Sequence, residues 1–60
     1  MKFRIEITRD DSEVIHRATV DEMSPLRARV RAASLLALHS GRGANRARVL
    51  NDKDEELYKL

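Results

Sequence analysis

Arginine is the residue type whose chemistry stands out most in this chain, because six arginines and no acid lie between residues 24 and 50. Guanidinium groups match phosphate oxygens with paired hydrogen bonds, so this segment suits nucleic-acid binding. The candidate phosphate contacts are Arg4, Arg17, Arg46 and Arg48. We expect them on one open face of a sheet, which also holds Glu6. The alternative is a solvated basic surface, since the acidic segments 1–23 and 51–60 bring the net charge down to +2.

The other reactive residues form no catalytic or metal-binding pattern. The chain has no cysteine, which excludes thiol nucleophiles, disulfides and thiolate metal sites. Its two histidines, His16 and His39, have no further ligands at a suitable spacing. Its paired acids fall in expected turns, where carboxylates are normally solvated rather than catalytic. We therefore expect no enzyme activity, no cofactor and no metal.

The apolar pattern predicts four strands that would position these side chains. Apolar and polar residues alternate strictly over residues 1–8, as in a strand with one buried face. After a turn at 9–12, a second strand is expected over 13–20, and two more over 46–50 and 56–60. On the second strand, the side chains expected to face inward are Val14, His16, Ala18 and Val20.

A helix is predicted from Pro25 to about His39. Ser24 is a suitable N-cap, and Pro25 fits the first helical position, where its missing N–H costs nothing. Gly41 suits the left-handed conformation that ends many helices. At 100° per residue, five apolar side chains gather on one side and are expected to face the sheet: Leu26, Val30, Ala33, Leu36 and Ala37.

The element order β-β-α-β-β predicts an α+β fold, in which one helix packs on one face of a four-stranded antiparallel sheet. Residues 1–60 form a single small domain. The expected core consists of Phe3, Ile5, Ile7, Val14, Val20, Leu26, Val30, Ala33, Leu36 and Val49. Truncation of a core residue, Ile5→Ala or Leu26→Ala, is expected to cost about 2–5 kcal/mol.

Leu35 and Leu38 fall outside the helical stripe expected to face the sheet, near Arg27 and Arg31. Burying each leucine against a second chain would contribute roughly 1.5–3 kcal/mol before the cost of association. So short a chain buries a small share of its surface and gains from a partner. The leading hypothesis is a non-catalytic protein-interaction module, either a homodimer through Leu35 and Leu38 or a module for an unidentified protein, and the alternative is nucleic-acid binding.

The opening residues alternate in polarity and do not form the charged head and apolar run of a signal peptide. No apolar stretch approaches the ~20 residues that a membrane-spanning helix needs. We therefore expect a cytoplasmic protein with no membrane partner.

The order of the elements and two segments resemble small uncharacterised bacterial proteins with a β-β-α-β-β layout. The helix of those proteins opens "L-P-D-L-x-x-A-R", which is similar to Met23-Ser24-Pro25-Leu26 through Ala28-Arg29 here, followed by Ala32-Ala33. The closing "VLNDKDEELYKL" is similar to their final hairpin. This resemblance implies the fold and no activity. The opening "MKFRIEITRDD" also resembles, more weakly, the first strand of HicB-like antitoxin domains.

Overall fold

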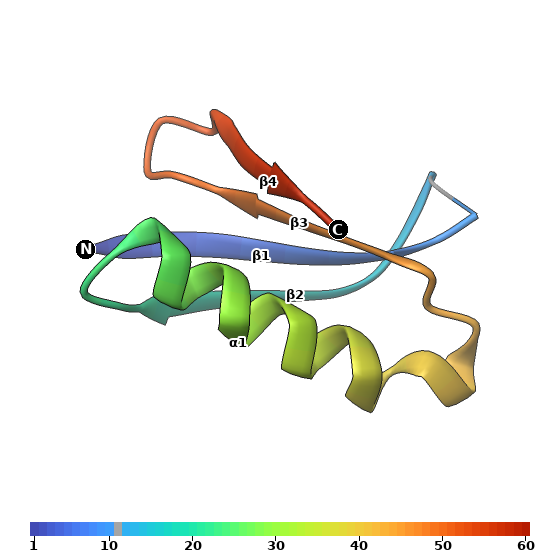
Figure 1. The fold of residues 1–60 in the computed structure, drawn as a ribbon. Helices are drawn as coiled ribbons and strands as arrows, with labels where there is room; N and C mark the ends of the chain where they lie inside the picture. The colour runs from blue at the N-terminus through green and yellow to red at the C-terminus, as the bar shows by residue number, and fades with distance from the viewer. Residues whose placement is uncertain (11) are drawn as a thin grey trace.

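The computed structural model describes residues 1–10 and 12–60 as a single sheet with one main helix across it (Figure 1). The elements in chain order are β1 (Lys2–Arg9), β2 (Glu13–Asp21), α1 (Pro25–Leu38), the 3-10 helix η1 (Ser40–Arg42), β3 (Arg46–Leu50) and β4 (Glu56–Lys59). The strands are antiparallel in the order β2-β1-β3-β4, and α1 lies on one face of the sheet. The predicted α+β fold is confirmed. The predicted turn at 9–12 includes Asp11, which lies outside the described residues.

The alternation of β1 separates the two faces of the sheet. Ile5 and Ile7 are fully buried on the helix side, whereas Glu6 between them belongs to the open face. Ile5 pairs with Ala18 on β2 and with Val49 on β3, so these side chains share the helix side. The fully formed core consists of Phe3, Ile5, Ile7, Ala28, Ala32, Ala47 and Val49.

Helix α1 begins as predicted, with the Ser24 hydroxyl accepting a hydrogen bond from the Arg27 amide at 3.3 Å. The most deeply buried residues of its inner face are small. Ala28 and Ala32 are fully buried, while Leu35 and Leu36 are partly buried against the same core. The bulky β1 and β3 side chains already fill the space between the layers, so alanines suit this contact.

The predicted inner stripe of the helix is wrong for four of its five members. Leu26 and Val30 are 58% and 62% exposed, and Ala33 and Ala37 are exposed as well. Only Leu36 packs against the core. The prediction gave most weight to the largest apolar residues, whereas the two fully buried residues of the helix are the alanines Ala28 and Ala32. The expected core positions Leu26, Val30 and Ala33 are therefore corrected to the solvent side.

A β-bulge changes the faces of β2. The register shifts after Ile7, which pairs with His16, so that Thr8 pairs with Val14. Ile15 is the extra residue, and it packs against the core. Val14 consequently shares the open face with Thr8, and its predicted inward position is wrong. The strict two-residue period of the prediction could not accommodate an inserted residue.

The residues that follow the C-terminus of α1 include a buried histidine and two glycines. His39 is buried, its Nδ1 lies 2.9 Å from the Leu35 carbonyl oxygen, and its ring stacks on His16 with centroids 4.5 Å apart. Gly41 lies inside η1, and Gly43 takes the left-handed conformation, with φ of 87°. The left-handed residue was predicted at Gly41 and lies two residues later, at Gly43, because η1 intervenes between α1 and the turn. A Cβ on Gly43 would also lie only 3.0 Å from the Arg9 side chain.

The placement of α1 makes Ile5→Ala and Leu26→Ala a matched test. We expect Ile5→Ala to lower the free energy of unfolding by about 2–5 kcal/mol, because it opens a cavity between the layers. Leu26→Ala should change it by less than about 1 kcal/mol, because the side chain lies outside the core. Urea unfolding followed by circular dichroism at low micromolar concentration measures both. Equal losses in the two variants would show that the helix presents Leu26 to the sheet.

Candidate interaction surfaces

The open face of the sheet is organised around one carboxylate. Glu6, in the middle of β1, is only 3% exposed, although no helix covers this side. Arg17 on β2 and Arg48 on β3 are its direct cross-strand neighbours. Arg17 Nε donates to Glu6 Oε2 at 2.9 Å, and Arg48 Nη2 donates to Oε1. Arg4, two positions away on β1, adds an ion pair with its Nε 3.5 Å from Oε2.

Two of these arginines also bind acids beyond β1. Arg4 Nη2 lies 2.9 Å from Asp54 Oδ1, in the turn between β3 and β4. Arg48 Nη1 donates to Glu56 Oε1 on β4 at 3.3 Å. A single network of ion pairs therefore connects all four strands across the open face. We call this set of side chains the Glu6 network.

The Glu6 network controls the protonation of its central acid. Burial alone would raise the pKa of Glu6, but hydrogen bonds from Arg17 and Arg48, together with their charges, lower it further than burial raises it. The net pKa of Glu6 is below its ordinary value. In turn, the hydrogen bond to Glu6 raises the pKa of Arg48. The carboxylate is thus held in its charged form by its neighbours.

The strand register brings the four candidate phosphate contacts to the open face. Arg4, Arg17 and Arg48 all contact Glu6 there, so each already has an acidic partner. Arg46 is exposed and helps to line a shallow depression on the same face with Thr8. Alternation placed Glu6 on this face, but a sequence pattern carries no sign that its side chain bridges three guanidiniums.

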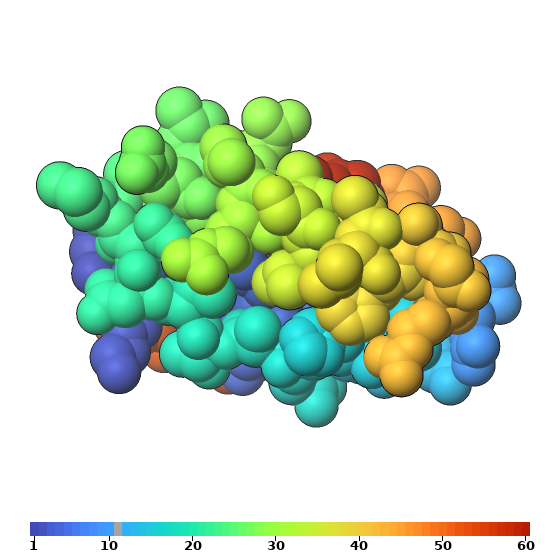
Figure 2. Space-filling model, turned by 90° about the horizontal axis from the view of Figure 1, so that it is seen from below, coloured from blue at the N-terminus to red at the C-terminus, as the bar shows by residue number. Residues whose placement is uncertain are grey.

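The outer face of α1 is the second distinctive surface. Leu26, Val30, Ala33 and Ala37 follow one another at intervals of four, three and four residues, and all are exposed. In Figure 1 no other element lies in front of α1, and Figure 2, seen from below, shows α1 above β2. Met23, just before the helix, is 87% exposed. We call the set Met23, Leu26, Val30, Ala33 and Ala37 the outer stripe.

The two predicted dimer contacts do not share a face. Leu35 is partly buried against the core, so its expected outward position is wrong. Leu38 is 76% exposed and lies beside the outer stripe. The predicted outward positions of Leu35 and Leu38 relied on a helix orientation that the structure does not have, because Ala28 and Ala32 face the sheet instead. Association through this helix stays a prediction, with different residues at its centre.

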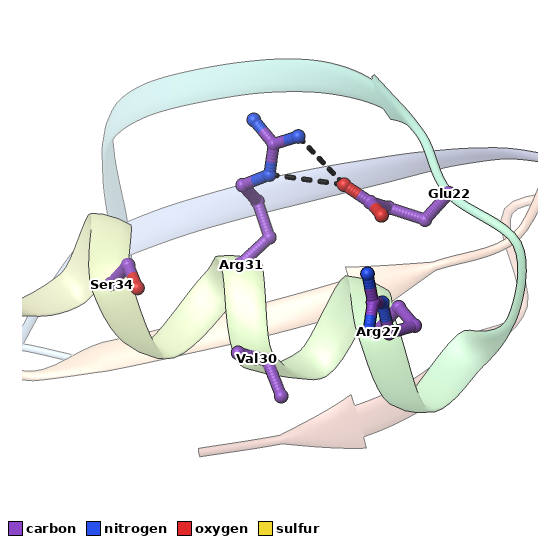
Figure 3. Close-up of a pocket in the computed structure, with 5 residues that line it drawn as sticks. All are labelled: Glu22, Arg27, Val30, Arg31 and Ser34. Atoms are coloured by element: carbon purple, nitrogen blue, oxygen red, sulfur yellow. Dashed lines mark hydrogen bonds and ion pairs between the residues drawn. The ribbon is translucent and has the colours of Figure 1, made fainter.

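Arginines border the outer stripe on both sides. On one side, Arg27 and Arg31 line a shallow depression with Glu22, Val30 and Ser34 (Figure 3). Within it, Arg31 Nη2 donates to Glu22 Oε2 at 2.7 Å. On the other side of the stripe, the guanidinium of Arg29 lies 5.6 Å from the centre of the Tyr58 ring. The helix itself, Pro25–Leu38, contains no acid.

Two further classes of site, metal centres and membrane-spanning helices, concern residues 1–10 and 12–60. No group of three or more histidine, cysteine or acidic side chains gathers there in a way that could hold a metal ion. Within the same residues, no helix has both the length and the apolar character needed to cross a membrane.

Comparisons with models of protein families, with curated proteins and with solved structures gave no match to this chain. The resemblances to small bacterial β-β-α-β-β proteins and to HicB-like domains therefore stay predictions.

The Glu6 network predicts a specific dependence of stability on pH. We expect Glu6→Gln to lower the free energy of unfolding at pH 7 by about 1–2 kcal/mol, because charge-assisted hydrogen bonds are lost while the exposed arginines limit their strength. Folding lowers the pKa of Glu6, so its contribution is complete above the ordinary value of 4.5 and is lost as the pH falls through the lower folded value. The natural chain and the Glu6→Gln variant should therefore become more alike in their free energy of unfolding below that pH.

Urea unfolding at pH 7 and at a series of pH values falling below 4.5 measures this difference. Glu13→Gln is the matched control, because Glu13 forms an exposed pair with Arg9 and should contribute less than about 1 kcal/mol. A Glu6→Gln variant as stable as the control at pH 7 would mean that the network adds nothing to folding.

Proposed function

We propose that this chain is a small non-catalytic protein-interaction module that binds its partner through the outer stripe of α1. The supporting observation is where the large apolar side chains are exposed. Among residues 1–10 and 12–60 they are Met1, Met23, Leu26, Val30, Leu38 and Leu57. Four of these six lie on α1 or directly before it. Exposed apolar side chains that gather on one face are typical of association sites.

Folding alone does not account for the outer stripe. Leu26 and Val30 lie opposite the alanines that contact the sheet, so they add little to the core. Polar residues at these two positions would serve the isolated fold equally well. A chain of sixty residues, however, gains stability by mass action from any partner that binds only the folded state. Association is therefore the role that these residue types fit.

Nucleic-acid binding is the second hypothesis, and the contacts of the open face weigh against it. Arg4, Arg17 and Arg48 would each have to give up or share the Glu6 carboxylate to bind a phosphate. The face also lacks stacking aromatics among the described residues, because the rings of Phe3 and Tyr58 pack on the helix side. We favour a protein partner for these reasons. The cytoplasmic location stays a prediction.

Fluorescence anisotropy with short single- and double-stranded DNA and RNA tests the second hypothesis. We expect no micromolar binding at physiological salt, because the arginines of the Glu6 network are already neutralised. Micromolar binding that weakens steeply with salt, and whose salt slope is reduced in the Arg46→Ala/Arg48→Ala variant, would instead support a phosphate-binding surface.

Site-specific photo-crosslinking in living cells tests the proposed module. A photoreactive amino acid at position 30, in the outer stripe, should yield covalent protein adducts. The same group at position 19, on the exposed edge strand β2, is the matched control and should yield few. The adducts at position 30 should also disappear when Leu26→Gln is added, because the stripe then loses its largest apolar member. Adducts that survive Leu26→Gln, or none at all, would contradict the proposal.

A further inference from the structure

We infer that the partner of the outer stripe is a second copy of this chain, bound through the same stripe so that the two α1 helices pack antiparallel. This inference rests on the proposed function and deepens it by naming the partner. Three features of α1 carry it: the order of large and small residues along the stripe, the placement of its arginines, and the Glu22–Arg31 ion pair.

Large residues occupy the first half of the stripe and small residues the second. In an antiparallel pair centred between Val30 and Ala33, Leu26 lies opposite the partner's Ala37, and Val30 lies opposite the partner's Ala33. Each large side chain then meets a small one, which lets the helices approach and interdigitate. A parallel pair would set leucine against leucine and alanine against alanine, with a gap at one end. The four-three-four spacing also suits the shallow crossing of helices in coiled coils.

The charges of α1 favour the same direction. Arg27, Arg29 and Arg31 lie in the first half of the helix, whose first turn has no acid, and the last turn has no base. The positive end of the helix dipole therefore carries the cations, while the negative end has none. An antiparallel copy places Arg27 of each chain beside the C-terminal turn of the other. A parallel copy would gather all six arginines at one end.

The middle of the helix, where the two-fold axis would pass, is the point at which identical side chains meet. Arg31 lies nearest to this point, and its ion pair with Glu22 offsets its charge. On the same side of the stripe, the depression next to Arg27 and Ser34 is open (Figure 3). In the antiparallel pair the partner's Leu38 lies level with Pro25, at the Arg27 end of this depression.

The size of the surface predicts how strong this association is. Helix α1 has 14 residues and is about 21 Å long, and only one face of it is in contact. Such an interface is smaller than those of stable dimers, so we expect a reversible dimer with a dissociation constant on the order of 100 µM. The dimer should form and dissociate as the protein concentration changes.

The absence of cysteine from the sequence allows single-cysteine crosslinking. In the antiparallel pair the two copies of position 30 are three residues apart along the helix axis, about 4.5 Å, and the two copies of position 26 are eleven apart, about 16 Å. A disulfide needs Cα atoms within about 7 Å. In a glutathione redox buffer we therefore expect Val30→Cys to form a disulfide dimer and Leu26→Cys to remain monomeric. The double variant Leu26→Cys/Ala37→Cys should also crosslink.

Sedimentation equilibrium of the natural chain accompanies this experiment. The average mass should rise from 6.9 kDa toward twice that value as the concentration reaches about 1 mM. The Leu26→Gln/Val30→Gln variant should stay monomeric, whereas Leu57→Gln, which removes an exposed leucine from β4, should dimerise like the natural chain. Circular dichroism verifies that every variant retains the fold.

Each contrary outcome has a separate meaning. Equal crosslinking of Leu26→Cys and Val30→Cys would overturn the antiparallel direction. A natural chain that stays monomeric at about 1 mM and forms no disulfide at position 30 would overturn the second copy as partner. If photo-crosslinking at position 30 then still captures a different protein in a Leu26-dependent way, the proposed function stands and only this inference falls. If it captures nothing, both fall.

Discussion

A carboxylate removed from water on a sheet face with no covering helix has to be compensated by cations, and Glu6 sets this condition for the whole open face. An unpaired buried charge costs several kcal/mol, and arginines reach Glu6 from both neighbouring strands to offset that cost. Arg17 and Arg48 meet this need because each is the direct cross-strand partner of Glu6. A one-residue slip of either strand would turn an arginine toward the core and leave the carboxylate without its partner. The network therefore favours the register of β1 against its two neighbours, β2 and β3.

This constraint also changes the meaning of the arginine-rich segment. Six arginines without an acid between residues 24 and 50 suggest a surface for an anionic partner. In the folded chain part of that imbalance is resolved internally, since Arg31 and Arg48 of this segment bind acids from residues 1–23 and 51–60. Glu6, Asp54 and Glu56 are paired with Arg4 and Arg48, and Glu22 is paired with Arg31. Charge segregation along the sequence thus becomes charge pairing in space, and the apolar outer stripe is left as the more distinctive surface.

Local sequence signals predicted the elements well and their orientation less well. The alternation of β1 predicted both faces of the sheet, because every second residue of an unbroken strand points the same way. Ser24 and Pro25 predicted the helix start through chemistry confined to one turn. The helix orientation depends instead on the space left by Ile5, Ile7 and Val49 of distant strands, where Ala28 and Ala32 are fully buried and Leu35 and Leu36 only partly buried. The same limit applies to the bulge at Ile15 and to the contacts of Glu6, because both depend on a neighbouring strand. The open-face position of the arginines was thus predictable, and their binding of Glu6 was not.

The bulge on β2 has a counterpart on β4, where Val49 pairs with Tyr58 and Leu50 with Glu56, and the two together have a consequence for assembly. Ile15 is the extra residue on β2 and Leu57 the extra residue on β4, and these are the two outer strands of the sheet. An interrupted hydrogen-bonding edge is a poor template for a further strand, which is one way in which small β-containing proteins avoid fibrils and uncontrolled stacking. Growth of the sheet by edge-to-edge addition is therefore disfavoured at both ends. A chain built in this way can expose apolar residues on its helix and still limit its self-association to closed oligomers with a fixed number of subunits.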